Sequence, residues 1–166
     1  AGGLGTRLGK VTEKIPKSLV EVNGKTILSH ILDWALKQRC KNALILTGYL
    51  GEMFDNFTHE MDLVFIQENE PLGTGGALWY AKDSLENEFI LLWGDDYHPI
   101  NYNLLVSKHR RNNSQLTMTV TESHDSMNLK HENGKVIKYN KSSPSIDYNG
   151  YEAGTSIVKR SVVESL

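Results

Sequence analysis

Short, continuously apolar segments alternate with helical patterns along most of this chain. Apolar runs of strand length occupy residues 43–47, 63–67 and 89–93. Helical patterns follow or precede them over residues 26–39, 51–59, 74–85 and 102–112. Buried parallel strands read as continuous apolar runs, and each needs a crossover segment before the next. The order therefore predicts an α/β fold, a Rossmann-like and mostly parallel sheet with helices on both faces.

The character of the chain changes after Glu122. An alternating strand pattern at residues 116–121 is followed by a polar stretch in which Asn133-Gly134 is a typical hairpin turn. Strands are expected at residues 136–139 and 154–158, as a small β elaboration laid against the main sheet. We expect residues 1–166 to form a single domain. A glycine-rich opening with no strand before it, and a last helix that stops early, suggest that the first strand and the C-terminal part are missing.

Composition excludes several classes of function. The chain has 18 Lys and Arg against 20 Asp and Glu, a net charge of −2, which argues against a general nucleic-acid binder. Cys40 is the single cysteine, so neither an internal disulfide framework nor a Cys-rich zinc site can form. The longest apolar run, residues 89–93, is too short to span a membrane. No secretory signal opens the sequence, and we expect a cytoplasmic protein with no nucleic-acid or membrane partner.

The first 25 residues combine glycines with positive charge. They hold five basic side chains, including Arg7 and Lys17, against Glu13 and Glu21. Glycines let backbone N–H groups approach phosphate oxygens, and an arginine binds such oxygens in a bidentate fork. The spacing fits neither a Walker A motif nor a dinucleotide fingerprint. A dinucleotide-binding domain is therefore a weak alternative, and an ordinary glycine turn with solvated lysines is the other.

Two further segments lie where strands end. Asp95 and Asp96 follow the apolar run 89–93, and carboxylates at such a strand end suit Mg²⁺ shared with substrate phosphates. Residues 67–77 join a strand to a helix through small side chains, which would let a planar base lie against the backbone. A simple loop with Thr74 as the helix N-cap also fits this segment, and the two interpretations can hold together.

Together these segments resemble the sugar-1-phosphate nucleotidyltransferases, relatives of the glycosyltransferase-A fold. The resemblance rests on the loop AGGLGTRL at residues 1–8, on Pro16-Lys17, on VNGKTI at 22–27, on EPLGTGGA at 70–77, on Gly94-Asp95 and on AGTS at 153–156. These motifs occur in the family's order along nearly the whole chain. The form of residues 70–77 looks most like that of mannose-1-phosphate and heptose-1-phosphate guanylyltransferases.

The resemblance implies transfer of a nucleotidyl group from a nucleoside triphosphate, with GTP favoured, to a sugar 1-phosphate. It implies catalytic roles for Arg7, Lys17 and Asp95, with Asp95 also holding Mg²⁺. It implies nucleotide binding by Gly2, Gly3, Gly5, Thr6, Gln67, Gly73 and Thr74. It implies sugar-phosphate binding by Lys141, Glu152 and Gly154.

Three departures from the family pattern bear on these expectations. Lys141 stands in Tyr139-Asn140-Lys141-Ser142 where the family has Glu-Lys-Pro, and Glu152 stands where relatives often have Asn. A second metal-binding Asp would lie beyond Leu166. A catalytically inactive relative that binds nucleotide or sugar is therefore the leading alternative. The sequence leaves open which sugar is used and whether the chain forms a homo-oligomer.

Overall fold

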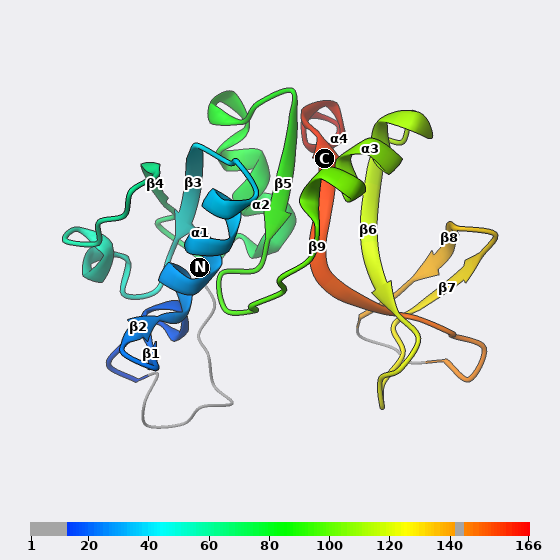
Figure 1. Ribbon diagram of the computed structural model, residues 1–166, viewed down its shortest axis with the longest axis horizontal. Coiled ribbons are helices and arrows are strands. Elements are labelled where there is room, and N and C mark those ends of the chain that lie inside the picture. Colours follow the sequence, from blue (N-terminus) through cyan, green and yellow to red (C-terminus); the bar gives the residue numbers. More distant parts are fainter. Residues whose placement is uncertain (1–12, 142–144) are drawn as a thin grey trace.

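The computed structural model describes residues 13–141 and 145–166 and has an α/β fold (Figure 1). The described strands are β1 (Glu21–Val22), β2 (Lys25–Thr26), β3 (Asn42–Thr47), β4 (Asp62–Gln67), β5 (Glu88–Leu92), β6 (Leu116–Thr121), β7 (Leu129–Glu132), β8 (Lys135–Tyr139) and β9 (Tyr151–Lys159). The helices are η2 (Lys17–Leu19), α1 (Ile27–Lys37), η3 (Gly51–Phe54), α2 (Gly73–Tyr80), η4 (Lys82–Ser84), α3 (Tyr102–Arg111) and α4 (Arg160–Glu164), where η marks a 3-10 helix.

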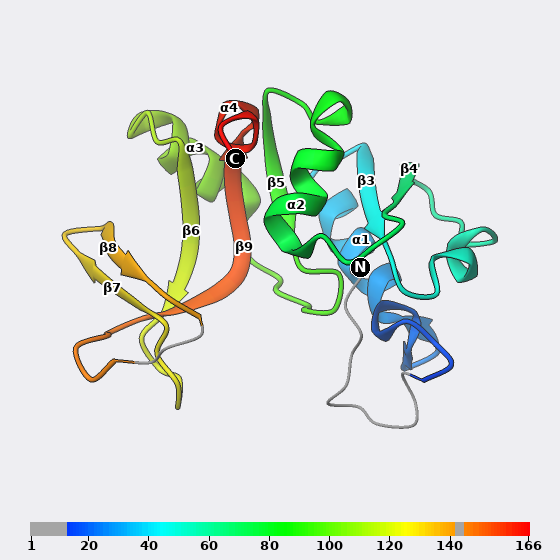
Figure 2. The same cartoon turned by 180° about the vertical axis from the view of Figure 1, so that it is seen from behind.

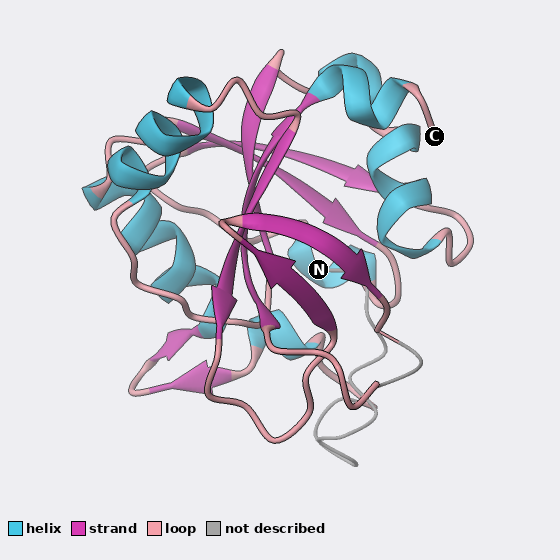
Figure 3. Cartoon of the chain, turned by 90° about the vertical axis from the view of Figure 1, so that its right-hand side faces the viewer, coloured by secondary structure: helices cyan, strands magenta, loops and turns pink. Residues whose placement is uncertain are grey.

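The strands form a parallel pair, β3 with β4, and a three-stranded antiparallel unit in the order β5–β9–β6. Views from opposite sides show α1 in front of one face and α2 in front of the other (Figures 1 and 2). The side view likewise shows helices flanking the strands (Figure 3). The α/β class with helices on both faces is thus confirmed. The insertion of β9 between β5 and β6 makes the sheet more mixed than the strand–helix alternation predicts.

Neighbouring residues of β3 and β5 face two separate hydrophobic clusters. On β5, Ile90 packs against the cluster around α1, whereas Phe89 and Leu91 pack against the cluster around α2 and α4. On β3, Ile45 and Leu46 divide in the same way. Successive side chains of a strand point to opposite faces, so a strand packed between two apolar clusters is apolar along most of its length. Each fully buried aliphatic side chain contributes about 1.5–3 kcal/mol.

Two helices illustrate how local sequence sets their starts. Helix α1 begins after Thr26, whose hydroxyl oxygen accepts the backbone N–H of Ser29 at 3.1 Å, as a normal N-cap does. The expectation that Thr74 caps α2 is wrong, because α2 already begins at Gly73 and its N-cap residue, Leu72, makes no side-chain cap bond. Gly73 has a φ of +68°, which a residue with a side chain adopts only at a cost.

Two hairpins turn on Asn-Gly pairs. Asn133 and Gly134 join β7 to β8 with φ values of +49° and +74°, which confirms the expected turn. Asn23 and Gly24 join β1 to β2 with φ values of +52° and +76°. This first hairpin carries the same Asn-Gly signal and was not expected. Between residues 51 and 59, only η3 is helical, so the longer helix expected there is wrong.

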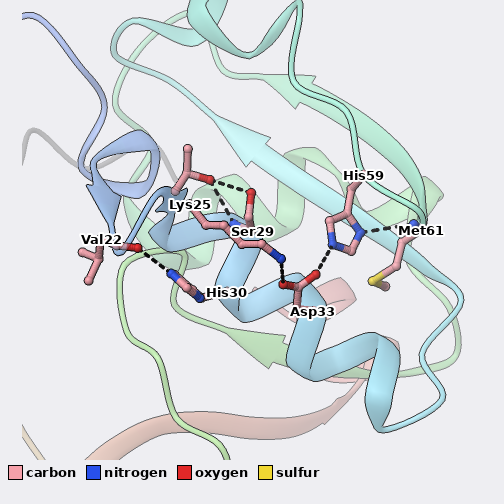
Figure 4. Close-up of polar contacts among 8 residues, drawn as sticks. Val22, Lys25, Ser29, His30, Asp33, His59 and Met61 are labelled. Atoms are coloured by element: carbon pink, nitrogen blue, oxygen red, sulfur yellow. Dashed lines mark hydrogen bonds and ion pairs between the residues drawn. The ribbon is translucent and has the colours of Figure 1, made fainter.

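A polar network holds the β1–β2 hairpin against α1 (Figure 4). Lys25 Nζ donates to Asp33 Oδ2 at 2.7 Å, and His59 Nε2 lies 3.1 Å from Asp33 Oδ1. Since His59 Nδ1 accepts the Met61 N–H at 3.2 Å, the proton of the neutral ring is on Nε2 and points at the carboxylate. The hydrogen bond from Lys25 is the main cause that lowers the pKa of Asp33. The network therefore fixes the hairpin that follows η2, the 3-10 helix in which Lys17 is the first residue.

Candidate functional site

Lys17 and Asp95 are in direct contact, although 78 residues separate them along the chain. Asp95 follows β5, and Lys17 opens η2 after the buried Pro16, which holds its φ at −52°. Lys17 Nζ donates to Asp95 Oδ2 at 2.7 Å, and the two side chains are 30% and 40% exposed. The structure thus brings an ammonium group and a carboxylate together at the end of β5, open to solvent. Two of the three residues assigned to catalysis meet here.

A second cluster surrounds the carboxylate of Glu152, whose side chain is only 8% exposed. Its Oε1 accepts the indole N–H of Trp93 at 3.0 Å and the backbone N–H of Gly154 at 3.1 Å. Its Oε2 lies 3.4 Å from Lys141 Nζ. The same ammonium group lies over the Trp93 ring, 4.1 Å from its centroid. The three residues expected on the sugar side therefore lie together, and Trp93 joins them.

The β7–β8 region supports this second cluster from the side. The Asn128 Oδ1 accepts the backbone N–H of Glu152 at 2.9 Å, and the Asn128 carbonyl accepts the backbone N–H of Asn140 at 2.8 Å. Burial is the main cause that raises the pKa of the Tyr139 hydroxyl, with Lys141 opposing the rise and Glu152 adding to it. Asn128 thus ties the chain around Glu152 to the chain that carries Lys141.

Gly154 of β9 packs against the turn that follows β5, which carries residues of both clusters. The register between β5 and β9 sets Leu92 opposite Thr155, which places Gly154 beside the residues that follow β5. A Cβ on Gly154 would lie 2.5 Å from Asp96 Oδ2 and 2.9 Å from Trp93 Cδ1. Its φ of +85° is also in the left-handed region. Gly154 therefore contributes by having no side chain, since a Cβ would push β9 away from the turn of Trp93 and Asp96, in which the Asp96 N–H donates to the Trp93 carbonyl at 3.3 Å.

The residues expected to hold the base lie around the ends of β3 and β4. Gln67 ends β4, and its side chain lies over Gly51, where a Cβ would be 2.6 Å from the Gln67 amide. The next residue, Glu68, accepts the backbone N–H of Leu72 at 3.4 Å and so shapes the loop before α2. Gly73 and Thr74 are exposed at the start of that helix. In the described part of the chain, no hydrogen bond joins these residues to Lys17 or Asp95.

The remaining expected residues, Gly2, Gly3, Gly5, Thr6 and Arg7, lie outside the described residues. The sequence argument missed Trp93 and Asn128. Trp93 itself could have been noticed, because it stands between the apolar strand and Gly94-Asp95. Its contact with Glu152 could not, because the two residues are 59 positions apart and no sequence pattern links them. Asn128 lies in a polar stretch where nothing marks it.

Comparison with known proteins identifies the class. The family model for nucleotidyl transferase matches residues 1–140, and the chain belongs to this family. The D-glycero-alpha-D-manno-heptose 1-phosphate guanylyltransferase of Campylobacter jejuni is 30% identical over 128 residues, which cover 75% of this chain and 56% of the relative. The UTP–glucose-1-phosphate uridylyltransferase AglF of Haloferax volcanii is 29% identical over 126 residues, 74% of this chain and 52% of the relative.

Two further matches cover essentially the whole chain. The mannose-1-phosphate guanylyltransferase catalytic subunit beta of Drosophila pseudoobscura is 30% identical over 99% of this chain and 48% of the relative. The crystal structure of HddC from Yersinia pseudotuberculosis complexed with GMP-PN superposes with a TM-score of 0.76 at 27% identity, covering all of this chain and 77% of the other. The resemblance to sugar-1-phosphate nucleotidyltransferases is thereby confirmed, and family membership decides against the dinucleotide-binding alternative.

The chain spans about half the length of the curated relatives that it matches. Among the helices of residues 13–141 and 145–166, none combines the length and apolar character needed to cross a membrane.

Proposed function

We propose that this protein transfers a nucleotidyl group from a nucleoside triphosphate to a sugar 1-phosphate in the cytoplasm, releasing pyrophosphate. The supporting observation is that Trp93, which contacts Glu152 and Lys141, and Asp95, which pairs with Lys17, stand two residues apart in the turn that follows β5. Two lysines, Lys17 and Lys141, thus lie in neighbouring clusters at one end of β5. We treat residues 1–166 as one nucleotidyltransferase domain.

The chemistry requires positioning and charge neutralisation. An oxygen of the sugar phosphate attacks the α-phosphorus in line, the bond to the β-phosphate oxygen breaks, and pyrophosphate leaves with the electron pair. In our assignment Lys17 contacts the reacting phosphates, and Arg7 stabilises the departing pyrophosphate. Lys141 holds the phosphate of the sugar. Glu152 and the backbone of Gly154 face the sugar ring.

The acidic end of β5 fits a magnesium ion of the kind shared with a substrate. Mg²⁺ is usually held by one or two carboxylates together with phosphate oxygens and water. Asp95 and Asp96 are both exposed there, and within the described residues no group of three or more His, Cys, Asp or Glu side chains forms a cage. We propose that Asp95 holds the ion. When bound, Mg²⁺ would neutralise charge on the triphosphate.

The nucleotide-binding side is assigned to two loops. Gln67, Gly73 and Thr74 would line the base pocket, and the opening loop of Gly2, Gly3, Gly5 and Thr6 would hold the triphosphate. We propose GTP as the preferred nucleotide, since the heptose-phosphate and mannose-phosphate relatives are named guanylyltransferases. UTP is the main competing candidate, since another relative is named a uridylyltransferase.

A pyrophosphate-release screen tests the proposal. The full-length protein is incubated with GTP, UTP, dTTP or CTP, Mg²⁺ and a panel of sugar 1-phosphates. We expect release that requires a sugar 1-phosphate and is fastest with GTP. Preference for another nucleotide would overturn the GTP assignment alone. Nucleotide binding without release in any combination would favour the inactive relative.

A further inference from the structure

We propose that Trp93 is a positioning residue for the sugar 1-phosphate, because it holds both Lys141 and Glu152 in place. The inference rests on the proposed function and adds to it a residue outside the motifs that suggested that function.

The indole of Trp93 contacts the two charged groups through different parts of the ring. Its N–H donates to Glu152 Oε1 at 3.0 Å, and its face lies beneath the Lys141 ammonium group, 4.1 Å from the centroid. A hydrogen bond to a carboxylate and a cation–π contact are both directional. One side chain therefore sets the orientation of a carboxylate and the position of a cation.

Trp93 is itself held in place. It directly follows β5, and the β5–β9 register brings the backbone of Gly154 against it. The indole Cδ1 occupies space that a Cβ on Gly154 would need, at only 2.9 Å. The ring is half-buried. A side chain packed against backbone and bonded at its N–H has little rotational freedom, so it can transmit a fixed geometry to its two partners.

The bonding of Glu152 shows which atoms are left for a ligand. Two N–H groups, from Trp93 and Gly154, are directed at Oε1. Oε2 faces Lys141 at the longer distance of 3.4 Å, and the Lys141 side chain is 49% exposed. A ligand that fits must offer an anionic group to the ammonium and a hydroxyl donor to the carboxylate oxygen beside it. A sugar 1-phosphate has both groups close together.

Two substitutions separate the two contacts. Trp93→Phe keeps an aromatic face beneath Lys141 and removes the N–H donor to Glu152, whereas Trp93→Leu removes both. We expect Trp93→Phe to raise the KM for the sugar 1-phosphate about tenfold or more, the scale of a lost hydrogen bond to a charged group. We expect Trp93→Leu to raise it a further two- to fivefold, the scale of a cation–π contact at a partly exposed site. The KM for the nucleoside triphosphate should stay unchanged.

Trp79 provides the matched control. Lys82 Nζ lies over the Trp79 ring, 3.7 Å from its centroid, and Trp79 is on α2, outside the Glu152 cluster. We expect Trp79→Phe and Trp79→Leu to leave both KM values unchanged. A rise in the KM for both substrates together, with a lower thermal midpoint, would mean that Trp93 serves only the fold and would overturn the inference.

Binding measurements keep the inference testable where no turnover is seen. Mannose 1-phosphate, glucose 1-phosphate and inorganic phosphate are titrated into the full-length wild-type, Trp93→Phe and Trp79→Phe proteins, with calorimetry and tryptophan fluorescence as readouts. We expect the sugar phosphates to bind wild type and Trp79→Phe with a fluorescence change, and to bind Trp93→Phe about tenfold more weakly. Equal affinity in all three proteins, or no binding of either sugar phosphate, would overturn it. Failure of turnover alone would overturn only the proposed function.

Discussion

Replacing Gly154 by alanine tests whether its missing side chain lets β9 pack against the turn after β5 that carries Trp93 and Asp96. At a φ of +85°, alanine carries the strain of a left-handed backbone, about 1–2 kcal/mol. The new methyl group would also lie 2.5 Å from Asp96 Oδ2 and 2.9 Å from Trp93 Cδ1. The exposed Asp96 carboxylate can rotate away, whereas the Trp93 ring is bonded to Glu152 and must shift. Overpacking of this kind costs roughly a further 1–3 kcal/mol.

Gly134 is the matched control for this change. It has a φ of +74° in the β7–β8 turn, and a Cβ there would meet nothing within 4 Å. Gly134→Ala should therefore show only the backbone strain. In a chain of this size each kcal/mol lowers the thermal midpoint by about 2–4 °C. We expect Gly154→Ala to melt about 2–12 °C below Gly134→Ala, with a raised KM for the sugar 1-phosphate. Equal melting and equal KM values would refute the reasoning.

Three other outcomes follow from the structure. Asp95→Asn should abolish Mg²⁺-dependent pyrophosphate release without lowering the thermal midpoint. The control Asp62→Asn, at the exposed start of β4, should release pyrophosphate as wild type does. Near-normal release by Asp95→Asn at saturating Mg²⁺ would contradict this prediction. Because the pKa of Asp33 is lowered from its ordinary 3.8, its contribution to stability is present at neutral pH and lost below about pH 4. Urea unfolding of Asp33→Asn should accordingly show a flatter pH dependence there. Burial lowers the pKa of His109 from its ordinary 6.5, so as the pH drops below 6.5 the imidazole is protonated more readily in the unfolded chain and stability falls. His109→Gln should remove that fall. An unchanged dependence of stability on pH in this variant would contradict the role given to His109.

The sequence predicts those parts of the fold that local pattern determines. β3 and β5 pack against a hydrophobic cluster on each face and β4 against one on a single face, and their apolar runs mark all three directly. Helices α1 and α3 follow the expected ranges to within two residues at each end. The Asn133-Gly134 turn is predicted because few residues other than Asn and Gly adopt its left-handed backbone. The contact between Lys17 and Asp95 joins two residues to which the resemblance assigns catalytic roles, and those roles stay a prediction.

The sequence does not predict what depends on distant partners. A strand is expected at residues 154–158, but as part of a small elaboration, whereas β9 is the central strand of its unit and contains Glu152, Thr155 and Ser156, all of which are buried. These polar side chains are tolerated because groups from elsewhere in the chain bond to them: for example, His98 Nδ1 lies 3.0 Å from Thr155 Oγ1. A strand whose burial relies on such partners lacks the continuous apolar run that marks a central strand. The role of Trp93 is hidden for the same reason.

The kinetics of two lysine variants test the central claim most directly. Lys17 and Lys25 each donate to an aspartate oxygen at 2.7 Å, but only Lys17 lies at the end of β5. If this end is the active centre, Lys17→Met should lower kcat about 100-fold or more, the scale of losing one charge-stabilising donor. Lys25→Met should leave kcat close to that of wild type. Wild-type turnover by Lys17→Met, or equal losses in both variants, would contradict the account.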